Sequence, residues 1–316
     1  MTFDLLGQKA QLPSSLHSHA HQYSKILLLP LLLSIAAFIP EYGQADGDHL
    51  EAKQVTDNIY MLSGSGGNIG VMVGDEGTFL IDDQMANVAP DLMASIDQVG
   101  GEFPRFLINT HFHFDHTGGN EILGLGGATI FSHKNARTRL ANGSDVPIFD
   151  LSVPPAPDQA LPVVTFDDTM NFHLNGETLR AVHVPKAHTD GDVVIFFEGS
   201  NVVHAGDIFF NGIYPVIDTY NGGSLQGMID AAAMLLDATD AKTIFIPGHG
   251  PLGSRSDLQD YLGLLLHTLD QLGRLKREGK NLEQVISSKP LAEFDAKWGA
   301  GFFPTDVWIG MIYQPL

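Results

Sequence analysis

"INTHFHFDHTGGN", residues 108–120, ends a short strand-like run, "RFLINT" (residues 105–110), and places three histidines and one aspartate within six positions. Side chains alternate along an extended segment, so we expect His111 and His113 to point the same way. Asp115 and His116 lie where the strand should break, and we expect them to diverge toward a second position. Gly118 and Gly119 are expected to let the backbone pass close to bound metals. Clusters of His and Asp indicate metal sites, so the stretch predicts a metal centre at the end of a strand.

Three further polar residues follow strand-like runs elsewhere in the chain. His188 follows "VHVPKA", Asp207 follows "NVVHAG", and His249 follows "TIFIPG", each beside a glycine, proline or loop residue. Because strand ends converge at the edge of a sheet, we expect these side chains to approach the 108–120 stretch.

The segments around these motifs alternate between strand and helix patterns. Extended apolar runs closed by Gly or Asp occupy residues 58–83, a helical pattern covers 89–100, and residues 118–142 predict helix, strand and helix. Strand patterns followed by helix patterns occur again from residue 177 onward, with helical patterns after Gly223 and over 257–279. Residues 143–162 predict a long loop of the kind that shapes binding sites. This order favours two sheets packed face to face with helices outside.

Composition excludes several classes of function. Seventeen Lys and Arg stand against 37 Asp and Glu, a formal charge of −20 that repels nucleic acid, so we expect no nucleic-acid partner. Cysteine is absent, which excludes disulfides, thiolate nucleophiles and cysteine-based zinc sites. Any transition-metal chemistry must therefore use His, Asp and Glu.

The one long apolar run, "ILLLPLLLSIAAFI" at residues 26–39, resembles the core of a secretory signal. It is shorter than the roughly 20 apolar residues that span a bilayer. We therefore expect a leader at residues 1–45, one domain at residues 46–316, no stable membrane insertion after leader removal, and a periplasmic or secreted protein. An uncleaved anchor or a buried helix is the alternative, and the oligomeric state stays open.

The motifs "THFHFDHTGGN", "PKAHTDGD", "VVHAGD" and "IPGHG" resemble, in order, those of the metallo-β-lactamase superfamily, over about residue 55 to at least residue 275. The resemblance implies an α+β fold, a four-layer αββα sandwich, with two zinc ions per chain. It implies that His111, His113 and His188 hold the first zinc and that Asp115, His116 and His249 hold the second, with Asp207 between the two. Asp82 in "FLIDDQ" matches an aspartate that supports the ligands, and Asp83 is the alternative register.

The same resemblance implies a metal-dependent hydrolase acting on a small molecule. A metal-bound hydroxide would attack a carbonyl carbon, and Asp115 would orient it and carry its proton. Opening of a cyclic amide, as in β-lactams, is the leading prediction. The alternatives are hydrolysis of an ester, lactone or thioester, and an iron-dependent oxidoreductase similar to persulfide dioxygenases.

Two details narrow the family. His116 and Asp207 stand where one lactamase subclass has Arg and Cys, and Phe210 stands where that subclass has a substrate-binding Lys. The ligand set resembles that of glyoxalase II. Basic residues at 274–280 are expected to complement the end of a helix. The aromatic run formed by Trp298, Phe302, Phe303 and Trp308 is expected to serve packing, with a groove lining as the alternative.

Overall fold

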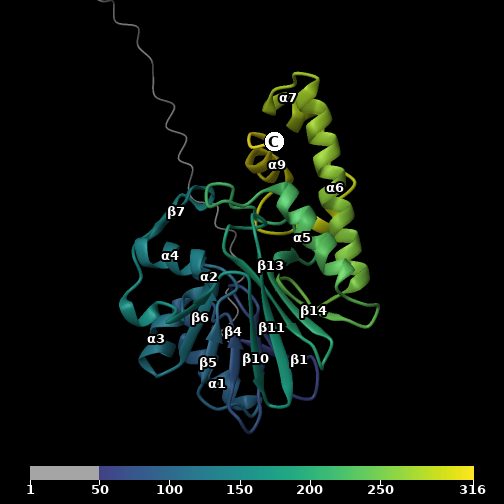
Figure 1. Cartoon of the computed structure of the whole chain (residues 1–316). Coiled ribbons are helices and arrows are strands. Elements are labelled where there is room, and N and C mark those ends of the chain that lie inside the picture. Colours follow the sequence, from purple (N-terminus) through teal and green to yellow (C-terminus); the bar gives the residue numbers. More distant parts are fainter. Residues whose placement is uncertain (1–49) are drawn as a thin grey trace, which may run out of the picture. The chain divides into compact units, whose positions relative to one another are not determined.

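The computed structural model describes residues 50–316 (Figure 1). The leader predicted at residues 1–45 lies outside the described residues. Between residues 50 and 316, no helix has the length and apolar character needed to cross a membrane.

Two large sheets form the centre of the described part of the chain. The first has the strand order β1 (Glu51–Gln54), β2 (Ile59–Ser63), β3 (Ile69–Met72), β4 (Phe79–Ile81), β5 (Phe106–Ile108), β6 (Thr129–His133) and β9 (Val164–Phe166). Strands β1 to β4 form an antiparallel meander, in which β2 to β4 lie in the runs predicted at residues 58–83 and β1 precedes them, and β4, β5, β6 and β9 run parallel.

The second sheet has the order β10 (Thr169–Leu174), β11 (Glu177–Val184), β12 (Asp192–Phe197), β13 (Val202–Phe210), β14 (Ile244–His249) and β15 (Gly253–Ser254). Strand β14 pairs with β13 in parallel because α5 crosses between them, and the other neighbours are antiparallel.

The described helices are α1 (Ala89–Gln98), α2 (Phe114–Thr117), α3 (Asn120–Leu125), α4 (Lys134–Asn142), α5 (Leu225–Asp237), α6 (Arg255–Arg277), α7 (Leu282–Ser287), α8 (Asp295–Trp298) and α9 (Thr305–Tyr313). Figure 1 shows α1 and α3 beside the strands β4 to β6, and α5 and α6 beside β13 and β14. Helix α6 begins with a capping box between Ser254 and Asp257 and ends with three basic residues. Both ends therefore carry the charges that stabilise a helix.

The pleat of the strands divides the apolar side chains among three packing layers. Phe79 and Ile81 of β4 face the second sheet, whereas Leu80 between them faces α1. In the same way Val193 and Ile195 of β12 face the first sheet and Val194 faces the helices. Both faces of each sheet are buried, so the fold is the four-layer αββα sandwich that the resemblance implied.

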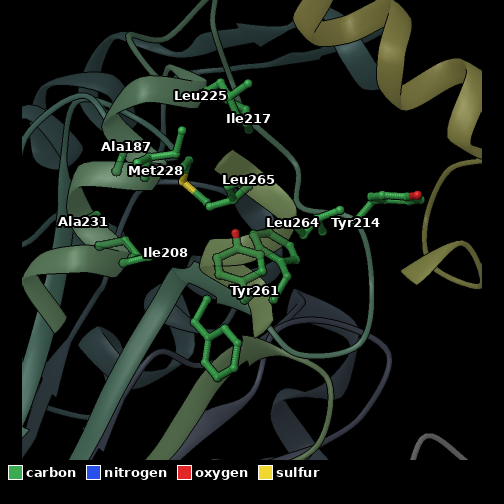
Figure 2. Close-up of a cluster of buried hydrophobic side chains, with 14 of the residues drawn as sticks. Ala187, Ile208, Tyr214, Ile217, Leu225, Met228, Ala231, Tyr261, Leu264 and Leu265 are labelled. Atoms are coloured by element: carbon green, nitrogen blue, oxygen red, sulfur yellow. The ribbon is translucent and has the colours of Figure 1, made fainter. Parts of the chain in front are cut away.

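Figure 2 shows the outer core of the second sheet, where Ile208 of β13 lies near Met228 and Ala231 of α5 and near Tyr261 and Leu264 of α6. Trp298 and Trp308 are also fully buried in this core. The core fixes the outer face of β13 at Ile208, and the adjacent Asp207 lies on the opposite face of the strand, toward the metal-binding motifs.

One region differs from the prediction. Residues 143–162, expected as a structureless loop, contain a two-stranded hairpin, β7 (Ser144–Val146) and β8 (Leu151–Val153), and short 3-10 turns at Pro147–Phe149 and Asp158–Ala160. Asp150 adopts a left-handed conformation with φ of 51°, which closes the hairpin. A third such turn, Ala86–Val88, precedes α1.

Candidate metal centre

The 108–120 stretch follows strand β5, but the backbone leaves the strand earlier than expected. Strand β5 ends at Ile108, so His111 and His113 lie in the irregular segment after it. Asp115 and His116 lie on the short helix α2, for which extended His113 is the N-terminal cap. The side chains therefore diverge because a helix starts between them, and strand alternation does not set their directions.

The structure nevertheless brings all the predicted ligand residues together. His111, His113, His188 and Asp207 form one group, and Asp115, His116 and His249 form another; the potential ligand atoms within each group lie within 4.8 Å of one another. His188 follows β11, Asp207 lies in β13, and His249 ends β14. The predicted convergence of strand ends therefore holds for His188 and His249, whereas Asp207 comes from within β13.

Asp207 lies between the two groups, with one carboxylate oxygen directed at each. Its Oδ2 is 3.4 Å from His188 Nε2 and 3.9 Å from His111 Nε2. Its Oδ1 is 3.1 Å from His116 Nε2 and 3.5 Å from His249 Nε2. This is the arrangement required for a carboxylate that bridges two cations.

Buried partners hold the imidazoles from behind. His188 Nδ1 lies 2.8 Å from the carbonyl oxygen of Val216, and His113 Nε2 lies 2.9 Å from Asp218 Oδ2. A carbonyl or carboxylate oxygen can only accept, so each of these ring nitrogens donates its proton. The opposite nitrogen of each ring then presents a lone pair to the group.

Asp82 orients one histidine in each group. Its Oδ1 accepts from the Thr110 backbone amide at 2.7 Å, and its Oδ2 accepts from the Thr110 hydroxyl at 2.7 Å and lies 2.8 Å from His116 Nδ1. The Thr110 hydroxyl oxygen also lies 3.0 Å from His111 Nδ1. Because the hydroxyl hydrogen is donated to Asp82, this oxygen accepts a hydrogen bond from His111 Nδ1–H. Asp82 has a φ of 62°, which is unfavourable for a non-glycine residue, so these contacts hold it in place. Asp82 is thus the supporting aspartate, and Asp83 instead accepts from Gly119.

The donor set fits metal cations. His113 Nδ1 and His188 Nε2 lie 2.9 Å apart, and the partners described above leave both nitrogens as acceptors. His111 Nε2 and Asp207 Oδ1 are buried without a hydrogen-bond partner. Lone pairs that face one another in a buried site repel unless a cation lies between them, and imidazole with carboxylate is a donor set that suits zinc.

The charges of the site also favour a bound cation. Burial lowers the pKa of His116 and of His249, but Asp207 and Asp115 more than reverse this, so the pKa of His249 rises to about 9 and that of His116 rises well above its usual value. Burial lowers the pKa of His188 to about 4, which keeps this ring neutral at physiological pH. The carboxylates therefore create a strong demand for positive charge around His116 and His249, which a divalent cation satisfies.

Asp115 is the most open member of the set. It is 17 % exposed, whereas His249 is 8 % exposed and Asp207 5 %. Burial raises the pKa of Asp115, but His116 and His249 outweigh it and the pKa stands at about 2. Asp115 is thus an ionised carboxylate at the accessible side of the site.

Glycines do clear space for the site, but they are not the predicted ones. A Cβ atom on Gly118 or Gly119 would meet the backbone of residues 83–86. A Cβ atom on Gly67 would lie 2.1 Å from His116 Cε1, and one on Gly248 would lie 2.0 Å from Asp207 Oδ1. The expectation for Gly118 and Gly119 was wrong because α2 turns them toward β4, away from the ligands.

Three supporting residues were missed by sequence reasoning. Thr110 precedes His111 inside the opening motif and could have been proposed from that position. Asp218 lies in an irregular segment with no motif, and its contact with His113 spans 105 positions of the chain. Asn221 Nδ2 donates to Asp218 Oδ2 at 2.6 Å and so fixes that carboxylate, again without a local signal.

Comparison with known proteins agrees with this geometry. Residues 62–249 match the family model described as the metallo-beta-lactamase superfamily. A probable metallo-hydrolase of Methanocaldococcus jannaschii is 26% identical over 209 residues, which cover 63% of this chain and 90% of that protein. A hydroxyacylglutathione hydrolase of Methylococcus capsulatus is 31% identical over 124 residues, covering 39% of this chain and 40% of that protein.

Among solved structures, a metallo-beta-lactamase from Pontibacter korlensis superposes with a TM-score of 0.58 at 20% identity, covering 69% of this chain and 99% of that one. At this identity the similarity shows the fold. The family match, together with the assembled His and Asp cluster, shows that the chain belongs to the metallo-beta-lactamase superfamily and is a metal-dependent hydrolase.

Proposed function

We propose that the chain is a dinuclear zinc hydrolase of carbonyl compounds, with cyclic amides of the β-lactam type as its leading substrate class. The position of Asp207, with one oxygen toward each group of ligands, is the observation that carries the dinuclear assignment. In this proposal His111, His113 and His188 hold one zinc, and Asp115, His116 and His249 hold the other.

Two bound zinc ions would supply a water that is nucleophilic at neutral pH and a Lewis acid for the carbonyl oxygen. The chain's own contribution is orientation and proton transfer. Asp82 and Asp218 hold the imidazoles in the required tautomers, so the site is rigid before substrate arrives. Asp115, ionised and accessible, accepts a proton from the attacking water. When the carbon–nitrogen bond breaks, Asp115 returns that proton to the leaving nitrogen.

Two complete ligand groups favour zinc hydrolysis over the iron-dependent alternative. A single-iron oxidoreductase of the persulfide-dioxygenase type needs only one group. In this structure the second group of ligand residues is also held in place by specific contacts. Asp82 orients the His116 ring, and Gly67 lies so close to that ring that a Cβ atom would collide with it. Metal analysis separates the two, because one iron per chain would overturn the zinc assignment.

A thioester substrate is the second candidate, on the similarity to a hydroxyacylglutathione hydrolase. Basic residues near 274–280 would be the recognition site for its glutathione. In the structure they end α6, where Arg274 pairs with Glu278 and Lys276 donates to the carbonyl oxygen of Tyr313. These contacts support the expectation that the basic residues stabilise the end of the helix, and they make glutathione binding, and so a thioester substrate, less favoured.

The test is turnover of a chromogenic cephalosporin by the zinc-loaded chain, repeated with a chelator and then with zinc restored. We expect turnover that the chelator abolishes and zinc restores. If the lactam is untouched while an ester or thioester is hydrolysed with the same chelator sensitivity, the lactam assignment fails and the hydrolase assignment stands.

We also propose that the protein is exported, on the signal-like run at residues 26–39. Fractionation of the producing cell, followed by N-terminal sequencing, tests this. A periplasmic or secreted chain that starts near residue 46 supports export, and a cytoplasmic chain with an intact leader contradicts it.

A further inference from the structure

Four partly exposed phenylalanine rings form a continuous series at the site, which we name the aromatic arc: Phe114, Phe149, Phe303 and Phe302. Phe302 lies edge-on to the His249 ring, with centroids 4.9 Å apart. Phe303 follows at 6.4 Å from Phe302 and stacks on Phe149 at 5.6 Å. Phe149 then meets Phe114 at 6.4 Å.

One end of the arc contacts the proposed ligand set, and the other end is next to it in the sequence. One end contacts His249, and the other end, Phe114, lies in the chain between His113 and Asp115. The arc therefore runs beside the accessible side of the site, where Asp115 is exposed. Three separate segments build it: the helix α2, the turn Pro147–Phe149 and the stretch before α9.

Phe302 and Phe303 pack against the core under α5, but both rings are only partly buried. Trp298 and Trp308, from the same aromatic run, are 2 % and 0 % exposed in the core, whereas Phe149 is 39 % exposed. Ile148, beside Phe149, packs against both the core under α5 and the cluster around α4. The turn is thus anchored by Ile148 and leaves the Phe149 ring partly exposed.

The surroundings of the arc contain no contacting cation. In residues 50–316, cation–ring contacts fall on Phe106, Phe112, Phe196, Trp298 and Tyr313, and on none of the arc rings. The charged residues next to these rings in the chain, apart from histidine, are Asp115 and Asp150, both acidic. Such a surface favours uncharged apolar groups, because a charged group would lose hydration there without gaining a partner.

We infer that the aromatic arc binds an uncharged apolar group, alkyl or aromatic, attached to the acyl side of the substrate carbonyl. The inference rests on the proposed function, because the arc gains this role from its contact with the proposed zinc ligands. It narrows the substrate class to carbonyl compounds with an apolar acyl group.

Direct binding gives a readout that does not depend on turnover. The full chain, stripped of metal by a chelator, is titrated with the neutral fluorescent probe N-phenyl-1-naphthylamine. We expect Phe149→Ala, and separately Phe303→Ala, to weaken binding at least about fivefold, since each removes a large contact area. The matched control is Phe103→Ala, because Phe103 is similarly exposed, at 42 %, and precedes β5 at the end opposite the site. Equal binding by all these proteins, or no binding, overturns the inference.

A kinetic series supplies the second readout. In p-nitrophenyl esters from acetate to octanoate, each added methylene should raise kcat/KM by about two- to fourfold, the range expected for apolar burial. Phe149→Ala should flatten this slope, whereas the control Phe103→Ala should leave both the slope and the acetate rate nearly unchanged. A mono-p-nitrophenyl ester of a dicarboxylic acid, of the same length as the hexanoate, should react more slowly than the hexanoate.

The outcomes separate the two proposals. Chelator-sensitive turnover with no dependence on chain length, unaffected by Phe149→Ala, refutes the arc and leaves the hydrolase standing. Absence of chelator-sensitive turnover on lactams, esters and thioesters refutes the proposed function, and probe binding still decides the arc. Thermal unfolding of each variant shows whether a change in binding reflects loss of the fold.

Discussion

Replacement of Gly67 by alanine tests whether the His116 side of the site is needed. The added Cβ would lie 2.1 Å from Cε1, 2.4 Å from Nε2 and 2.6 Å from Nδ1 of His116. Hydrogen bonds restrain both the Gly67 backbone and the His116 ring, so neither can move away easily. Gly67 donates its amide to the carbonyl oxygen of Asp115 at 3.1 Å, and Asp82 holds His116 Nδ1 at 2.8 Å.

The size of the effect follows from these contacts. Real Cβ contacts are rarely under 3 Å, so the imidazole and the loop must separate by about 1 Å, against a tolerance of roughly 0.2 Å in metal–ligand distances. Overpacking of this kind costs about 1–3 kcal/mol of stability. We expect the Gly67→Ala variant to bind about one zinc instead of two and to lose at least tenfold in chelator-sensitive kcat.

The assay is zinc content by elemental analysis, with urea unfolding and steady-state kinetics on the same preparation. Two controls are available. Ser65→Ala alters an exposed position in the same loop, and Gly263→Ala adds a Cβ with no neighbour within 4 Å, on the helix α6. The latter should be neutral or stabilising by up to about 1 kcal/mol. A Gly67→Ala protein with two zincs and full activity would refute the reasoning.

Two further predictions concern other residues. Asp218→Asn removes the charge that holds His113 Nε2 at 2.9 Å, so zinc affinity measured by competition with a chelating indicator should fall about 10- to 100-fold; an unchanged affinity would show that Asp218 does not support the ligand. Burial, with His183 stacked on the ring, lowers the pKa of His133 from 6.5 to about 4. As pH falls, His133 is therefore protonated at a higher pH in the unfolded chain than in the folded chain. The contribution of His133 to stability is therefore complete above pH 6.5 and is lost as pH falls toward 4. The variant His133→Asn keeps an acceptor for the Asn135 amide but cannot titrate, so its urea midpoint should fall less over this range than that of the wild type; parallel curves would contradict the assignment.

Local patterns predicted which residues the fold brings together, as well as most strands and several helices. His111 and His113 lie in one motif, and His188, Asp207 and His249 each follow an apolar run, so the polar residues near the ends of these runs could be selected from the sequence. Short-range periodicity likewise defined α1 and α6 because their apolar faces repeat over several turns.

The misses have physical causes. Strands β7 and β8 have three residues each, like β4 and β5, but their sequences SDV and LSV lack the continuous apolar run FLI that marks those two strands. Trp298 and Phe302 belong to one aromatic run, and both pack on the core as expected, but Phe302 also contacts His249, which the run by itself does not indicate. Asp218 reaches His113 only through the tertiary fold, so its own neighbourhood in the sequence contains no sign of its role.

We propose that Asp207 bridges two metal ions, and the decisive measurement is the metal content of the wild type and of the Asp207→Ala variant by elemental analysis. The wild-type chain, purified with zinc and then dialysed, should contain about two zincs, and the variant should lose zinc together with chelator-sensitive hydrolysis. A wild-type chain with a single iron, or an Asp207→Ala chain that keeps two zincs and full activity, would contradict the account.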